Sequence, residues 1–143
     1  IHHLFSLMQR KNEVKRMYEA ICHGSLDVKK GTVDAPIARK KDSIIERCVA
    51  VDGQVAITHY EVVKEFDGYS HVRLNLETGR THQIRVHLSY LGHPLLGDTL
   101  YGGDKESIHR QALHCSYLRF IHPITNEQID FNIPLEKDLI NLV

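Results

Sequence analysis

The side chains best suited to chemistry lie in residues 69–102, which read YSHVRLNLETGRTHQIRVHLSYLGHPLLGDTLYG. Two arginines, Arg80 and Arg85, offer guanidinium groups that bind carboxylates or phosphates in a fixed geometry. Asp98 is the carboxylate of residues 78–102, so it is a candidate nucleophile or acid–base group. The turn-forming glycines around Asp98 favour a plainer role, in which it caps its own turn. These residues together indicate recognition of an anionic partner.

The elements that must position these residues follow from the spacing of apolar side chains. Residues 69–76 alternate apolar and polar, which predicts a strand with one buried face. A turn at Thr78–Gly79 leads into a helix, in which three residues share a buried face: Ile84, Leu88 and Leu91. We expect Thr78 or Thr81 to cap its start and Gly92 to end it.

The two arginines stand at different places on this predicted helix. Arg85 leaves from the edge of the buried face, where a guanidinium shielded from water needs an anionic partner. Arg80 stands near the helix start, which disfavours cations, so it is expected to reach for a group outside the helix. The plain alternative is that both form ordinary surface ion pairs.

Two stretches carry a resemblance to a known family. TGRTHQIRVHL followed by LGHPLLGDTLYG resembles the RluA-type RNA pseudouridine synthases, and VKRMYEAICHG resembles their second motif. The resemblance implies that Tyr18 is the active-site tyrosine and that Arg85 pairs with the catalytic carboxylate. It also implies RNA contacts in the central motif and in the basic loop of GTVDAPIARK, made by Arg80, His82, Gln83, Arg39 and Lys40. Acidic residues at Asp42 and Glu46 stand where the family usually has basic ones, which weakens the prediction for that loop.

The family's essential aspartate lies in an Arg-Leu-Asp motif, and no such motif occurs in this chain. We therefore expect residues 1–143 to be the C-terminal part of a single catalytic domain, a truncated piece that is inactive alone. The chain starts at Ile1 inside an amphipathic pattern, and residues 2–12 are expected to form a short helix.

The resemblance implies an isomerase that converts uridine to pseudouridine in structured RNA, either rRNA or tRNA. That chemistry requires no cofactor and no metal. We expect a cytoplasmic monomer, with RNA as its partner and no membrane association. Two alternatives remain: a non-catalytic RNA-binding module derived from the family, and an unrelated hydrolase or metalloprotein that uses the histidines.

Composition and the placing of cysteine and histidine residues bear on the choice among these three functions. The 18 Lys and Arg balance the 18 Asp and Glu, so net charge does not indicate nucleic acid, although basic residues gather in the first third. The 3 cysteines form no paired motif, which favours a reducing compartment. His82 and His87 fall on different sides of the predicted helix, which argues against a shared metal ion.

The remaining patterns predict the fold class. Period-two alternation over residues 15–23 puts Met17, Glu19 and Ile21 on one face of a strand and Tyr18, Ala20 and Cys22 on the other. Residues 55–66 predict a second strand, joined by a turn at Asp67–Gly68 to the strand 69–76. Residues 113–131 predict a last hairpin that turns near Asn126. We therefore expect an α+β fold, with a mixed, mostly antiparallel sheet, a central helix and a few short helices packed on it.

Overall fold

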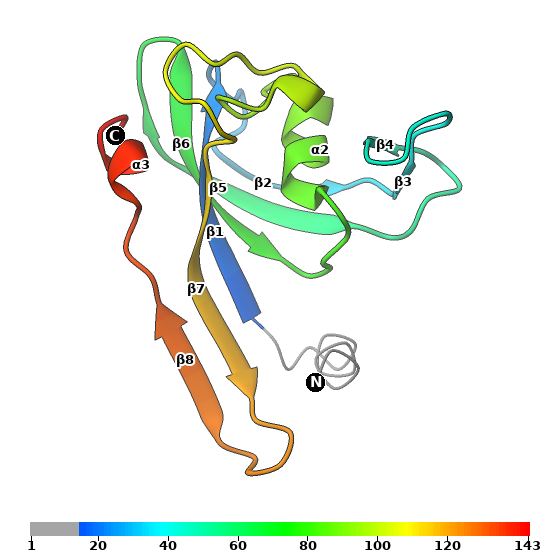
Figure 1. Ribbon diagram of the computed structural model, residues 1–143, viewed down its shortest axis with the longest axis vertical. Coiled ribbons are helices and arrows are strands. Elements are labelled where there is room, and N and C mark those ends of the chain that lie inside the picture. The colour runs from blue at the N-terminus through cyan, green and yellow to red at the C-terminus, as the bar shows by residue number, and fades with distance from the viewer. Residues whose placement is uncertain (1–14) are drawn as a thin grey trace.

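The structure is a computed structural model that describes residues 15–143, and a single large sheet organises it (Figure 1). The strand order is β2-β5-β6-β1-β7-β8. Their bounds are β1 Lys15–His23, β2 Lys30–Asp34, β5 Ile57–Glu65, β6 Tyr69–Leu76, β7 Leu113–Ile121 and β8 Gln128–Asn132. The α+β class and the mostly antiparallel sheet are confirmed. A mixed sheet was expected, but every pairing between described strands is antiparallel.

A short hairpin and a 3-10 turn lie beside one helix, and a second short helix lies apart from it. Helix α2 spans Gln83–Tyr90, and the short hairpin of β3 (Ile37–Arg39) and β4 (Arg47–Val49) lies beside it. Figure 1 shows this hairpin projecting away from the sheet on the far side of α2. A 3-10 turn, η1, covers Thr99–Tyr101, and the short helix α3 covers Lys137–Ile140.

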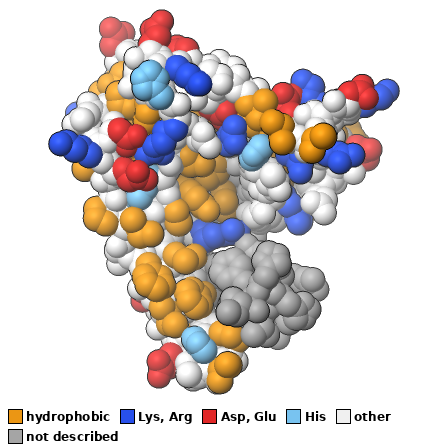
Figure 2. All heavy atoms as spheres, viewed as in Figure 1, with side chains coloured by type: hydrophobic (Ala, Val, Ile, Leu, Met, Phe, Trp, Pro, Cys, Tyr) orange, Lys and Arg blue, Asp and Glu red, His pale blue; other side chains and the backbone are white. Residues whose placement is uncertain are grey.

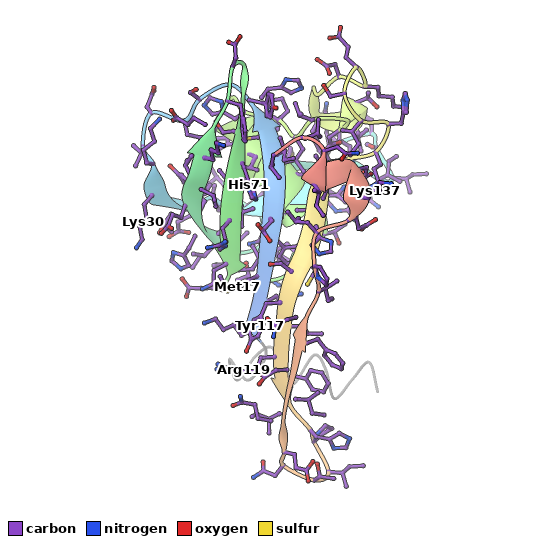
Figure 3. The ribbon with its side chains drawn as sticks, turned by 90° about the vertical axis from the view of Figure 1, so that its left-hand side faces the viewer. Met17, Lys30, His71, Tyr117, Arg119 and Lys137 are labelled. Carbon is purple, nitrogen blue, oxygen red and sulfur yellow. The ribbon has the colours of Figure 1, made fainter. Side chains whose placement is uncertain are left out.

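The two faces of the sheet bury different side chains, because successive residues of a strand point to opposite sides. Ala20 and Cys22 of β1 pack in the cluster that contains Ile84 and Leu88 of α2. Ile21 instead packs with Leu139 of α3. Figure 3 shows the face that carries α3, from which Met17, His71 and Tyr117 project. The alternation predicted for β1 is confirmed.

The start and end of α2 differ from the sequence prediction in part. Ile84 and Leu88 are buried as expected, but Leu91 is 37% exposed. Leu91 is the C-cap residue of α2 and no longer belongs to its buried face. Gly92 follows with φ 89°, a backbone conformation that glycine adopts without steric cost, and the predicted end of the helix is confirmed.

The predicted hairpins are confirmed. Asp67–Gly68 joins β5 to β6, and the Phe66 N–H donates to the Tyr69 carbonyl across that turn. Asn126 has φ 61° in the turn between β7 and β8. The helix predicted over residues 2–12 lies outside the described residues.

The β7–β8 hairpin extends well beyond the rest of the sheet. Figure 2 shows hydrophobic side chains gathered along it, and Phe131 and Ile133 are 48% and 44% exposed.

Within residues 15–143, no helix has the length and apolarity needed to cross a membrane.

Candidate functional site

A cavity of about 390 Å³ opens between β1 and the beginning of α2. Its polar lining comes from Arg16, Tyr18, Arg80, His82, Gln83, Arg85 and Gln111. Tyr18 stands on β1 and Arg85 on α2, so the two residues that the motifs single out do meet at one cavity. Three guanidinium groups line this one hollow, a set of donors suited to binding an anion.

Arg85 is held by a carboxylate within this chain. Its Nε and Nη2 donate to Asp98 Oδ2 and Oδ1, both at 2.9 Å, and the Asp98 side chain is 0% exposed. The hydrogen bonds to Asp98 raise the pKa of Arg85, so its charge is secure. The guanidinium carbon also lies 5.0 Å from the centre of the Tyr101 ring, in a cation–π contact.

This pair adds a role for Asp98 beyond the expected one of capping its turn through its own backbone. The residue precedes η1, but its side chain makes no capping hydrogen bond there. Its backbone carbonyl closes the turn instead, accepting from the N–H groups of Tyr101 and Gly103. The carboxylate is thereby left to bind Arg85. The pairing spans two elements, so the local pattern around Asp98 did not reveal it.

Tyr18 lies where β1 is irregular. The register between β1 and β7 shifts between Met17 and Tyr18, a bulge of the kind that redirects side chains. Burial raises the pKa of Tyr18, while nearby Arg16 lowers it, so the phenol is neutral at physiological pH. Arg16 lies against Gly79, where a Cβ atom would fall 2.3 Å from its Nη2. The small residue in the turn before α2 thus gives Arg16 its place in the cavity.

Gln83 is fixed by hydrogen bonds to the protein. It is 3% exposed, and its Oε1 accepts from the Thr78 hydroxyl and the Arg80 N–H. Its Nε2 donates to the Ile57 carbonyl and the Thr58 hydroxyl. These four bonds use the amide fully. Gln83 therefore holds the turn in front of α2, and its predicted RNA contact stays a prediction that this geometry disfavours.

Helix α2 begins at His82 and not at either threonine that was expected to cap it. His82 is the N-cap residue, with φ 58° in the left-handed region, and no side chain caps the helix. The prediction that Thr78 or Thr81 caps α2 is therefore wrong. The Thr78 hydroxyl is engaged by Gln83 and by the Ile57 N–H. Burial, followed by the charges of Arg85 and Arg47, lowers the pKa of His82, so it is neutral near pH 7.

His82 and His87 point to separate surroundings, as the sequence predicted. His87 is 0% exposed and contacts Thr58 and the Ala35 carbonyl, whereas His82 contacts Tyr101. Among residues 15–143, no three His, Cys, Asp or Glu side chains are grouped as metal ligands would be.

A second hollow of about 300 Å³ adjoins the first through Arg80, which lines both. Arg39 and Arg47 of the β3–β4 hairpin supply further positive charge there. Arg80 Nε donates to the Val55 carbonyl at 2.7 Å, which anchors it outside the helix as expected. Lys40 forms an ion pair with Glu46 instead of lining either hollow, so the acidic substitution noted in the sequence engages a predicted RNA-binding residue. Figure 2 shows Lys and Arg side chains gathered around this hairpin.

Three site residues were missed from the sequence: Arg16, Arg47 and Tyr101. Arg16 was within reach, because it lies two residues before Tyr18 and shares its face of the strand. Tyr101 stood within the LGHPLLGDTLYG motif. Arg47 gave no signal, since its place depends on how the hairpin packs against α2.

Comparison with known proteins agrees with the motifs. The family model described as RNA pseudouridylate synthase matches residues 1–90. The chain is 56% identical over 142 residues to the RNA pseudouridine synthase YjbO of Bacillus subtilis (strain 168), covering 99% of this chain and 50% of that protein. It is 44% identical over 151 residues to ribosomal large subunit pseudouridine synthase D of Vibrio parahaemolyticus, covering 96% and 46%.

A solved structure shows the same architecture. The human protein RNA pseudouridylate synthase domain containing 1 superimposes with a TM-score of 0.76 at 30% identity, covering 90% of this chain and 58% of that one. The chain thus spans about half the length of the curated relatives that it matches.

Proposed function

This chain belongs to the RluA-type family of RNA pseudouridine synthases, and we propose that the complete protein converts uridine to pseudouridine in a structured rRNA or tRNA. The observation that carries the proposal is the convergence of Tyr18, Arg85 and two further arginines on one cavity. A target base must leave its stack to react, so the site needs a pocket, an aromatic surface and cations for the RNA backbone.

The chain's own side chains have distinct roles in this proposal. The reaction breaks the glycosidic bond between C1′ and N1, turns the uracil and rejoins it through C5. Tyr18, a neutral phenol at the cavity, provides a surface on which the base stacks. Arg85 orients the essential carboxylate. Its Nε and Nη2 are taken by Asp98, and its Nη1 has no hydrogen-bond partner among the described residues, so that nitrogen remains to bind a second carboxylate.

Asp98 itself is a poor nucleophile in this arrangement. Both of its oxygens accept from Arg85, and its side chain has no exposed surface. We therefore propose that this chain alone forms no pseudouridine and that the essential carboxylate comes from another segment of the complete protein. We also propose a cytoplasmic, monomeric enzyme.

The test compares the complete protein, its Tyr18→Phe and Arg85→Lys variants and this chain alone on uridine-containing RNA, by carbodiimide labelling and primer extension. We expect the complete protein to form pseudouridine and this chain alone to form none. We expect slow turnover by Arg85→Lys, because lysine keeps the charge but lacks the planar guanidinium group. RNA binding without product by the complete protein would instead support the non-catalytic module. Turnover by this chain alone would show that a carboxylate within it performs the reaction, and would overturn this part of the proposal.

A further inference from the structure

The Tyr101 hydroxyl joins three elements at the edge of the cavity. It accepts from the Arg47 backbone N–H of β4 at 2.9 Å and lies 2.7 Å from His82 Nδ1 at the start of α2. The Ser89 hydroxyl donates to the Tyr101 carbonyl at 2.8 Å, which fixes the backbone of η1 against α2. Tyr101 is therefore held from both ends.

These contacts favour one ring nitrogen of His82 as the site of its proton. A phenol hydroxyl has one proton to donate, and the Arg47 N–H already occupies an acceptor position on its oxygen. Among the described residues, the remaining neighbour within hydrogen-bond distance is His82 Nδ1, which is therefore the acceptor available to the hydroxyl proton. Burial raises the pKa of Tyr101, which keeps that proton on the phenol. A neutral His82 must then carry its own proton on Nε2.

His82 Nε2 is left available to a ligand. It has no hydrogen-bond partner among the described residues, and every buried side-chain nitrogen or oxygen among them has one. Nε2 is therefore accessible from outside, and His82 lines the cavity. The residue also sits at φ 58°, which costs a non-glycine residue about 1 kcal/mol or more. An unfavourable backbone conformation at a residue that lines a cavity indicates function rather than packing.

We propose that Tyr101 is a positioning residue that holds His82 as the Nε2–H tautomer, so that His82 donates a hydrogen bond to an oxygen atom of RNA bound in the cavity. The inference rests on the proposed function, since it assumes that RNA enters there. The groups that face His82 agree with it: Arg85 of α2 and Arg47 of β4 oppose a second proton, and Asp98, which favours one, is the weakest of these influences.

The first test needs no RNA. Nitrogen NMR of the complete protein, with its histidines labelled, reports which ring nitrogen of His82 carries the proton. We expect Nε2 to be protonated and Nδ1 to show an accepted hydrogen bond that Tyr101→Phe removes. A proton on Nδ1, or an unchanged Nδ1 signal in Tyr101→Phe, would overturn the proposal whatever the protein binds.

The second test separates the two nitrogens of His82 by substitution. Glutamine places its amide near the Nε2 position and keeps the donor, whereas asparagine places its amide near Nδ1 and keeps only the partner for Tyr101. Asparagine also tolerates the left-handed conformation well, so His82→Asn is expected to fold. We expect His82→Asn to weaken binding of a uridine-containing RNA stem-loop about three- to tenfold, the loss of one hydrogen bond, and His82→Gln to bind more tightly than His82→Asn.

Tyr101→Phe should weaken binding of the same stem-loop to a similar extent, while Tyr90→Phe on the exposed side of α2 is the matched control that should leave affinity unchanged. Equal affinities of His82→Gln and His82→Asn would contradict the donor role. If the unmodified protein fails to bind RNA, the proposed function fails, and the tautomer measured by NMR still decides the role of Tyr101.

Discussion

Arg85 binds Asp98 through one side of its guanidinium and leaves the other side open. Its Nε and Nη2 donate to the two oxygens of Asp98 in a bidentate ion pair, which fixes the direction in which Nη1 points. The family resemblance implied one carboxylate partner for Arg85, the family's essential aspartate. The structure adds a partner within the chain, and the free edge of the guanidinium makes the two compatible. Asp98 is thus the residue that orients Arg85.

We predict that Asp98→Asn lowers the free energy of unfolding by about 3 kcal/mol, because it leaves the shielded Arg85 charge without its counter-ion. Asparagine has nearly the same volume, so loss of packing does not account for such a change. Denaturant unfolding of the complete protein provides the measurement.

A matched control exists in the same chain. Arg110 binds Asp138 through the same fork, with both distances 3.0 Å, but the side chains are 37% and 45% exposed. Asp138→Asn should cost at most about 1 kcal/mol, because water and salt screen this pair. Equal losses in the two variants would show that the shielding of Arg85 contributes nothing.

Helix α2 is joined to the sheet by a buried chain of hydrogen bonds. Gln83 Nε2 donates to the Thr58 hydroxyl, which donates to His87 Nδ1, and His87 Nε2 donates to the Ala35 carbonyl. Thr58 and His87 are 1% and 0% exposed. Each donor in the chain has one acceptor, so protonation of His87 Nδ1 would break it.

The buried chain predicts a pH dependence of stability. Burial lowers the pKa of His87, so as pH falls the unfolded state takes up a proton first, near its ordinary value of about 6.5. Stability from this group is present above that pH and declines below it, by at most about 1.4 kcal/mol per pH unit. His87→Gln should reduce the decline of the unfolding free energy between neutral pH and pH 5. The same change at exposed His109 is the control, and an equal reduction there would rule out His87 as the cause.

The loop before η1 requires glycine beside Asp98. Gly97 has φ 77°, and a Cβ atom there would lie 1.9 Å from the Arg110 carbonyl oxygen. Gly68 has φ 86° but open space around it. We predict that Gly68→Ala costs about 1 kcal/mol for its backbone conformation, and that Gly97→Ala costs at least about 2 kcal/mol more. Thermal melting checks both, and similar losses would mean that the loop adapts to the clash.

The elements of this fold were more predictable than their contacts. The alternation of apolar and polar residues predicts strands β1, β5 and β6, and turn residues predict the hairpin turns. Both are local properties of the sequence. We expected Tyr18 and Arg85 to lie at one cavity because the family resemblance matched both residues to active-site positions. The Arg85–Asp98 pair, the start of α2 at His82 and the exposed Leu91 depend on packing between elements, and no local pattern encodes those contacts.

At the scale of the whole molecule, charge is segregated rather than abundant. The formal net charge is zero, yet arginines line two adjoining hollows. The face that carries α3 mixes charges of both signs (Figure 3). Lys30 lies near Glu61 there, and a hollow is lined by Lys15 and Arg73 beside Glu19. If the complete protein binds RNA as proposed, long-range attraction is weak for the part of it described by this chain, and we expect binding to depend on contacts at the arginine-lined side.

This segregation predicts which cations determine the salt dependence of RNA binding. Each phosphate contact releases counterions, so removing one such contact reduces the slope of log affinity against log salt by about 0.7 to 1. Arg39 and Arg80 line the hollow beside the β3–β4 hairpin, whereas Lys137 belongs to α3 on the opposite face of the sheet (Figure 3). Arg39→Gln and Arg80→Gln should each reduce the slope by this amount, and Lys137→Gln should leave it unchanged. Filter binding of a uridine-containing stem-loop over a range of salt concentrations measures all three. A reduced slope for Lys137→Gln, with none for the arginine variants, would place the RNA on the α3 face and refute the assignment of the two hollows.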